Sequence, residues 1–371
     1  MTLSASELGS RIAEARGRAG LTQDQLAREI GMDRSGLAKI ETGARRVSAL
    51  ELSRIASGVN ERVEWLLSDP VPAVISHRNM LEPGDPSPNI DAAVERFAYA
   101  CEFVASQDQG LQETLFQLRH MEEPLTDDGM ERLAERARTL IGVDQDEPLR
   151  ELGSKLAEVG LLTWALTLGN DSADASSILL PQGALAVVNA SLKPGRRRLA
   201  LAHEFGHALL ADDYSVDWRV DTGVDKREAA IDRFSRALLI PSASLSKLWT
   251  QWADRGDIRA AAVRTASHYR VDMTTLARRL EETGLLKDGD SALIRSTRTT
   301  KADIVEYNLV PADELESGYL SLEYVKAVLR IFRGEIIGED RAIDLLLDTW
   351  PTEELPTLPK RNETEIWEFV G

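Results

Sequence analysis

The chain has almost no cysteine, because Cys101 is the single thiol among its 371 residues. One thiol excludes an intrachain disulfide framework and a cysteine-rich structural metal site, and it agrees with a reducing compartment. The sequence also lacks any apolar run near the ~18 residues that a membrane-spanning helix needs. Its first residues lack the basic-then-apolar layout of a signal peptide. We therefore expect a cytoplasmic protein that makes no contact with a membrane.

Positive charge is also scarce. The chain has 44 Lys and Arg against 61 Asp and Glu, which gives a net charge of -17. Such a balance excludes general nucleic-acid affinity through bulk electrostatics, so any DNA contact must come from a local module. Residues 1–70 contain ten basic and ten acidic side chains, so this part is neutral and the remainder carries the negative charge. The length is enough for two to four domains with their own cores.

The apolar stretch 199–210 contains two histidines and a carboxylate. If it is a helix, His203 and His207 lie one turn apart on the same face. Two imidazoles at this spacing can bind one zinc ion, and Glu204 lies beside them, where it can activate a water. Because the surrounding residues are apolar, the helix is predicted to be buried, and its polar groups then need a partner. A metal ion would be that partner.

A second apolar helix is predicted over 227–240, just before Pro241. Glu228 and Asp232 lie four residues apart on it and share a face. Glu228 can complete a His-His-Glu site whose fourth position is open to water. Asp232 can accept a hydrogen bond from the far nitrogen of a ligand histidine and so fix its orientation.

Three other interpretations of this region stay open. The first helix could be an ordinary core helix without metal, and Glu228 could be a surface acid stabilised by the helix dipole. The zinc could also be structural, but such sites are usually closed and rich in cysteine, so a chain with one cysteine favours an open, catalytic site. Zinc, manganese or another divalent ion could occupy the site in the cell.

These motifs resemble the ImmA/IrrE family of zinc peptidases. The residues that carry the resemblance are His-Glu-Phe-Gly-His-Ala-Leu-Leu at 203–210, Glu228, Asp232, Phe234 and Leu-Leu-Ile-Pro at 238–241. Ser235 and Ile240 depart mildly from the usual family wording. The resemblance implies a zincin-like (gluzincin) peptidase with Zn2+ as cofactor, Glu204 as general base, and an edge strand bordering the cleft. A donor that stabilises the oxyanion is also expected. His268, Tyr269 and Tyr214 are candidates, and the sequence does not choose between them.

The first 67 residues are predicted to form five short helices. Thr22 and Asp33 are placed as N-caps of the second and third, with the turn at 31–33 between these two helices. Helix, tight turn, helix is the layout of DNA-binding helix-turn-helix domains. The stretch resembles the Xre/Cro repressor family through Gln23-x-x-Leu26-Ala27, Gly31, Ile40-Glu41-x-Gly43 and Leu52-x-x-Ile55-Ala56.

The second resemblance also implies roles for individual residues. Arg34, Ser35 and Lys39 are expected to read bases, and Gln23 with Arg45 or Arg46 is expected to contact phosphates. Repressors of this kind bind double-stranded operators as symmetric homodimers, which is what we expect here. Because the domain is neutral, a role in dimerisation or partner binding alone stays open.

The predicted fold class is mainly α with a small β-sheet (α+β). Strands are predicted at 161–168, 177–180 and 184–189, before the metal-binding helix. Five prolines between residues 69 and 89 predict a stiff linker. The predicted domains are a helix-turn-helix domain at 1–69, a linker at 70–89, a helical bridge at 90–125, the peptidase at 126–290, and an acidic, mainly helical region at 291–371.

Together these features predict a DNA-binding transcriptional regulator fused to a zinc endopeptidase. By the resemblance, its substrate would be a repressor-type protein, cut in a stress or mobile-element response, or the chain's own linker. The alternative is a repressor or antitoxin whose peptidase-like domain is latent or inactive and serves partner binding or sensing.

Overall fold

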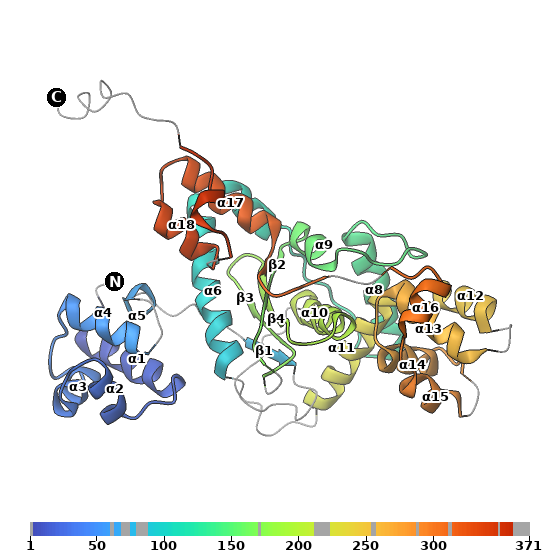
Figure 1. Cartoon of the computed structure of the whole chain (residues 1–371), viewed down its shortest axis with the longest axis horizontal. Coiled ribbons are helices and arrows are strands. Elements are labelled where there is room, and N and C mark those ends of the chain that lie inside the picture. The colour runs from blue at the N-terminus through green and yellow to red at the C-terminus, as the bar shows by residue number, and fades with distance from the viewer. Residues whose placement is uncertain are drawn as a thin grey trace.

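The computed structural model describes residues 3–59, 63–67, 75–78, 88–169, 172–210, 223–253, 257–286, 289–310, 314–347 and 349–358. It consists of many helices and one small mixed sheet, which confirms the predicted α+β class (Figure 1). None of the described helices is long and apolar enough to cross a membrane.

The N-terminal unit consists of five helices around a core of its own. They are α1 (Ala5–Arg18), α2 (Gln23–Glu29), α3 (Arg34–Glu41), α4 (Ala49–Gly58) and α5 (Val63–Leu67). Ser4, Thr22 and Ser48 begin their helices with capping boxes, and the carboxylate of Asp33 accepts the N–H of Gly36 at the start of α3. The local sequence thus sets where each helix begins, as the N-cap residues predict.

Within the described residues, five strands form one sheet in the order β1-β3-β4-β2-β5. The strands are β1 (Ile75–Arg78), β2 (Leu161–Leu166), β3 (Ala175–Leu179), β4 (Ala184–Asn189) and β5 (Tyr319–Leu320). The pair β2–β4 is parallel, and the other pairs are antiparallel. The three central strands were predicted from the sequence, whereas the two edge strands were not.

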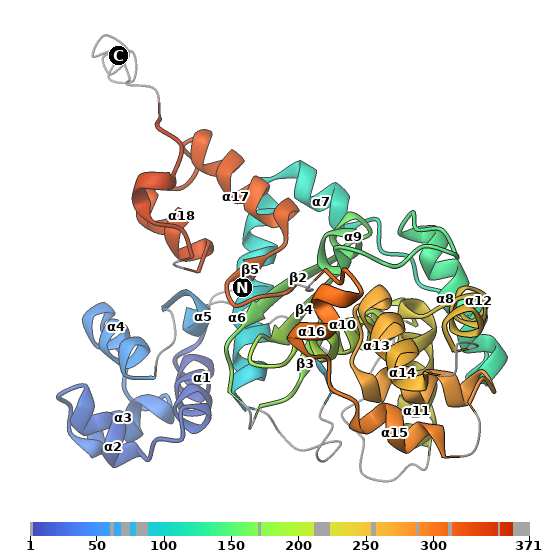
Figure 2. The same ribbon diagram turned by 45° about the vertical axis from the view of Figure 1, so that its right-hand side comes forward.

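Among the remaining helices, α6, α9 and α10 pack on the sheet, and α12 to α16 gather to one side of it (Figure 2). Their bounds are α6 (Pro88–Gln107), α7 (Gln109–Leu115), α8 (Asp127–Leu140), α9 (Leu152–Glu158), α10 (Pro194–Leu209), α11 (Gly223–Leu239), α12 (Ser242–Ala253), α13 (Ile258–Tyr269), α14 (Met273–Glu282), α15 (Asp290–Ser296), α16 (Lys301–Glu306), α17 (Leu322–Arg333), α18 (Glu339–Leu345) and the 3-10 turn η1 (Thr352–Glu354).

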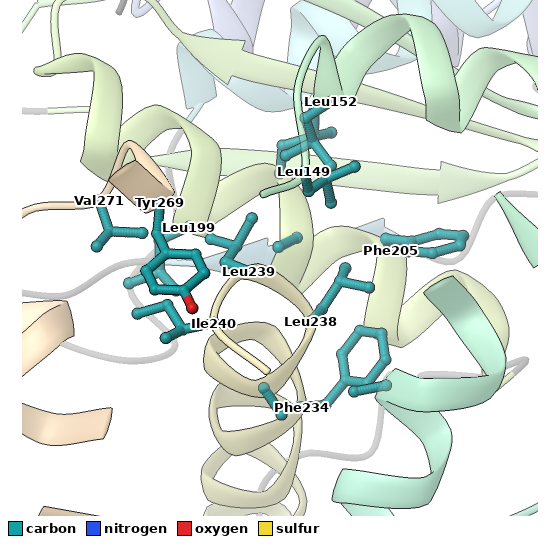
Figure 3. Packing of buried hydrophobic residues seen from close by; sticks show 14 of the residues in the cluster. Leu149, Leu152, Leu199, Phe205, Phe234, Leu238, Leu239, Ile240, Tyr269 and Val271 are labelled. Carbon is teal, nitrogen blue, oxygen red and sulfur yellow. The ribbon is translucent and has the colours of Figure 1, made fainter. Parts of the chain in front are cut away.

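The two faces of the sheet belong to two different cores, as strand alternation requires. Ala165, Ala186 and Val188 join a large cluster with α10 and α11, part of which is shown in Figure 3. Trp164 and Val187 join a second cluster on the opposite face, with α6 and α17. The ring of Trp164 stacks on Phe97 and meets Tyr324 edge-on, with centroids 6.0 and 4.9 Å away. Helix α10, which carries His203 and His207, therefore packs on one face of the sheet only.

Two segments that lie outside the predicted peptidase domain form the edge strands of this sheet. Residues 75–78, inside the predicted linker, pair with β3, and residues 319–320, inside the predicted C-terminal region, pair with β2. In both cases the strand forms because an open sheet edge is available, not because its own sequence shows a pattern. The predicted domain boundaries themselves stay a prediction.

A buried charge network links α10 to the segment before β5. The guanidinium of Arg198, fully buried, binds the carboxylate of Glu314 and donates to the carbonyl of Leu149 at 2.6 Å. Arg270 binds the other oxygen of Glu314. Burial alone would raise the pKa of Glu314, but these two guanidinium groups hold that pKa below its ordinary value.

Candidate metal centre

Helix α10 begins at Pro194. Proline suits this position because an N–H in the first helical turn has no partner within the helix, and proline has none to satisfy. Nearly all of the helix is buried, including His203, Glu204 and His207. A Cβ atom on Gly206 would lie 2.8 Å from Ile231 and 2.9 Å from Phe234, both on α11. Glycine in the motif therefore lets α11 approach α10 closely, and this approach brings the second helix to the histidines.

Three predicted ligand atoms meet between α10 and α11. The Nε2 atoms of His203 and His207 are 3.1 Å apart. Oε2 of Glu228 lies 3.1 Å from Nε2 of His203, and Oε1 lies 3.5 Å from Nε2 of His207. The three atoms form a group that a single cation can join. The structure thus brings together all three residues that the sequence predicts as ligands.

The spacing of these atoms fits zinc. Bonds of 2.0–2.1 Å at tetrahedral angles place two ligand atoms about 3.3 Å apart. The two ring nitrogens are 3.1 Å apart, and each has a different oxygen of Glu228 at 3.1 or 3.5 Å, which is close to that value. Although burial would raise it, contacts with the two rings hold the pKa of Glu228 below its ordinary value, so the carboxylate is an anion. Two imidazole rings and one carboxylate are a typical donor set for zinc.

Asp232 lies against the first ring, on the side away from His207. Its Oδ1 lies 2.9 Å from Nδ1 of His203, and its Oδ2 lies 3.7 Å from the guanidinium of Arg236. When Nδ1–H donates to this carboxylate, the lone pair of Nε2 points at His207 and Glu228. In that tautomer a metal ion between these groups would bind Nε2 and the carboxylate of Glu228 together.

Glu204 lies beside the ligands, where sequence reasoning places a general base. Its side chain is fully buried, and Oε2 accepts a hydrogen bond from the hydroxyl of Ser177 on β3 at 2.5 Å. Its Oε1 is buried and has no hydrogen-bond partner among the described residues. A buried unpaired carboxylate oxygen is costly, so this atom is suited to a ligand that arrives with a proton to share.

The oxyanion candidates are not part of this group. Tyr269 is fully buried, and its hydroxyl shares a hydrogen bond of 2.8 Å with Ser244 in the core (Figure 3). The ring of His268 lies edge-on to Trp252 and to Tyr269. The hydroxyl of Tyr269 is thus engaged by Ser244 in this structure, and the roles of Tyr269 and His268 as oxyanion donors stay predictions. Tyr214 lies outside the described residues.

The predicted DNA-reading residues are mostly on the surface of the N-terminal unit. Arg34, Ser35 and Lys39 on α3 are exposed, as are Arg45 and Arg46. The hydroxyl of Ser35 donates to Asp33 at 2.5 Å, and Arg45 pairs with Glu51 at 2.5 Å.

Gln23 lies at a contact between helices. Its amide donates to Glu41 at 2.6 Å, and the same carboxylate binds Arg16. The amide group has a second N–H, and the expected phosphate contact of Gln23 stays a prediction.

Ser177 is the site residue that sequence reasoning missed. A single hydroxyl in a buried strand has no distinctive spacing, and its role comes from α10 packing against β3. The strand β1 was missed as well, because it forms only through its pairing with the edge of β3.

Comparison with known proteins agrees with both halves of this description. Residues 12–66 match the family model Helix-turn-helix, and residues 170–281 match the family model IrrE N-terminal-like domain. Both resemblances seen in the sequence are confirmed. Among solved structures, the chain is similar to the restriction-modification controller protein C.AhdI from Aeromonas hydrophila. The identity is 32% over 94% of that chain and 17% of this one, with a TM-score of 0.17. No match is found among curated proteins.

Proposed function

We propose that this chain, which joins a helix-turn-helix domain to an IrrE N-terminal-like domain, is a DNA-binding transcriptional regulator with a zinc-dependent endopeptidase of its own. The observation that carries the proposal is the group of His203, His207 and Glu228, which can each offer one ligand atom within 4.8 Å of the other two. Glu204 lies next to this group with one buried, unpaired oxygen.

The residues divide the work of peptide hydrolysis as follows. When bound to the three ligands, zinc supplies the Lewis acidity that polarises the scissile carbonyl and the attacking water. Glu204 takes a proton from that water through Oε1 and later gives it to the leaving amine. The hydroxyl of Ser177 holds Oε2 and so fixes the rotamer of the base. Asp232 keeps Nε2 of His203 available for the metal.

The N-terminal unit supplies the contact with DNA in this proposal. Within the described residues, Arg34, Lys39 and Arg46 are exposed cations that make no ion pair, so they are available to a nucleic acid. Helix α3 would enter the major groove of a double-stranded operator, with a homodimer reading two half-sites. The substrate would be a repressor-type protein or the chain's own linker, cut in a stress or mobile-element response.

A second function is favoured by a specific observation. Strand β1 lies along β3, the strand that holds Ser177, so the region beside the general base is already covered by the chain. A repressor or antitoxin with a latent peptidase domain, used to bind or sense a partner, would have such a covered site.

Two substitutions test the enzymatic proposal. Glu204→Gln should keep one zinc per chain and abolish cleavage, whereas His203→Ala should lose both, because only the second removes a ligand. Glu158→Gln, the same exchange at an exposed acid on α9, is the matched control and should change neither. Zinc content is measured on the purified chain. Cleavage of the chain itself and of repressors encoded nearby is measured by intact mass. If the zinc-loaded wild type cuts none of them, the latent alternative is favoured.

A further inference from the structure

Strand β1 brings the segment between the N-terminal unit and α6 onto the sheet. It pairs antiparallel with β3 through four residue pairs, and Ser76 stands opposite Ser177 in this register. The hydroxyl of Ser177 in turn binds the carboxylate of Glu204. The backbone of β1 therefore lies one strand spacing, about 4.8 Å, from a residue that touches the candidate general base.

The position of β1 is the one that an extended peptide would take at this site. Helix α10, which carries the candidate metal ligands, packs against both β1 and β3. Extended peptides bind to sheets by adding a strand to an open edge, where main-chain hydrogen bonds hold them. One edge of β3 is paired with β4 inside the sheet, so its other edge is where a peptide can add. In the described structure β1 occupies that edge.

We propose that β1 is an autoinhibitory strand, which blocks the peptide-binding edge of β3 until it is displaced. This inference rests on the proposed function, since that function makes the occupied edge a substrate site. It adds that the substrate binds as an antiparallel strand in place of residues 75–78. It also adds that the blocking strand is supplied by the same chain, between its DNA-binding and peptidase parts.

The connection to the rest of the chain makes β1 an effective competitor. Only residues 68–74 separate α5 from β1, and 79–87 separate β1 from α6. A stretch of nine residues reaches at most about 30 Å, so β1 stays within that distance of the start of α6, which packs on β3. Short connections of this kind give effective concentrations on the order of millimolar. A free peptide must therefore compete with β1 for the edge of β3. A substitution that weakens the pairing of β1 with β3 should strongly increase the affinity of the peptide.

A pair of proline substitutions tests the blocking. Along an antiparallel strand, the N–H groups of successive residues point alternately to the neighbouring strand and away from it. Of Ser76→Pro and His77→Pro, one removes a hydrogen bond to β3 and the other removes none, so each serves as the control of the other. Both are made in the full-length, zinc-loaded Glu204→Gln chain, which cannot cut the probe. The probe is a fluorescein-labelled octapeptide that copies residues 73–80.

If β1 blocks the edge of β3, two results are expected. One proline variant should bind the peptide at least tenfold more tightly than the other variant and the unsubstituted Glu204→Gln chain, as measured by fluorescence anisotropy. In the same variant without peptide, hydrogen exchange should be faster for those amides of residues 175–179 that face β1, and added peptide should slow it again. Unchanged zinc content in both variants shows that the metal-binding part is folded.

The opposite results are equally clear. Equal peptide affinity in all three chains, or equal exchange of the β3 amides, would overturn the inference. Cleavage of the Glu204-containing chain between residues 75 and 78 would also overturn it, because β1 would then be a substrate. Neither binding readout requires hydrolysis. A chain that proves inactive but shows the two expected differences would refute the proposed enzymatic function alone.

Discussion

Removal of the carboxylate at position 232 should weaken metal binding without removing a ligand. In the folded chain Oδ1 of Asp232 lies 2.9 Å from Nδ1 of His203, and this contact fixes which ring nitrogen faces the metal. With Asp232→Ala the ring is free to rotate and to take the other tautomer, in which Nε2 carries the proton. Binding of zinc must then first restore the productive arrangement.

The structure sets the size of the effect. Loss of a carboxylate behind a ligand histidine costs 10- to 100-fold in metal affinity, which is about 1.4 to 2.7 kcal/mol. The side chain of Asp232 is 37% exposed, so water can partly replace it, and we expect the lower half of that range for Asp232→Ala. Asp232→Asn keeps an acceptor oxygen and should lose less than the alanine variant. Both variants should still bind one zinc ion.

Zinc affinity is measured by competition with a chromogenic chelator at constant pH. The control is Glu282→Gln, because Glu282 binds the guanidinium of Arg236 at 2.7 Å, the same group that lies near Asp232. This control perturbs the arginine without touching His203, so its affinity should equal that of the wild type. If Asp232→Ala binds zinc as tightly as the control, the orienting role assigned to this carboxylate is wrong.

Three further predictions concern other parts of the chain. Arg34→Ala with Lys39→Ala should abolish the electrophoretic shift of the promoter DNA and lower the salt dependence of binding, whereas Arg54→Ala on α4 should leave both unchanged. Because the pKa of Glu314 is lowered in the folded state, its stabilisation is complete above its unfolded value of about 4.5 and is lost as the pH falls further. The difference in melting temperature between wild type and Glu314→Gln should therefore shrink from pH 6 to pH 3. Cys101 is fully buried and burial raises its pKa, so Ellman's reagent should label it only after unfolding in guanidinium, and rapid labelling of the native chain would contradict its placement.

The candidate site could be predicted because its information is local. The spacing of His203 and His207, and of Glu228 and Asp232, is set by helix geometry, so one turn of sequence is enough to place each pair on a face. The two helices then meet because Gly206 and the apolar residues around it allow close packing. The α+β class and the three central strands could be predicted for the same reason.

The edge strands and two contacts could not be predicted, because they depend on partners distant in sequence. Residues 75–78 and 319–320 are too short to show a strand pattern, and each forms by pairing with an available edge. The link from Ser177 to Glu204 depends on how α10 lies on β3. Tyr269 is one of three candidate oxyanion donors, and its hydrogen bond with Ser244 is visible only in the folded chain.

The sheet face opposite α10 limits which fragments of the chain can fold alone. That face is covered by α6 and α17, and Arg330 on α17 binds Asp108 through both carboxylate oxygens at 2.6 and 2.7 Å. Residues 170–281 include neither helix, so a fragment cut to those limits would expose the apolar side chains beneath them to water. We expect such a fragment to aggregate on expression, and a fragment spanning 88–347 to stay monodisperse in size-exclusion chromatography. A fragment limited to residues 170–281 would thus lose the helices that cover one whole face of the sheet.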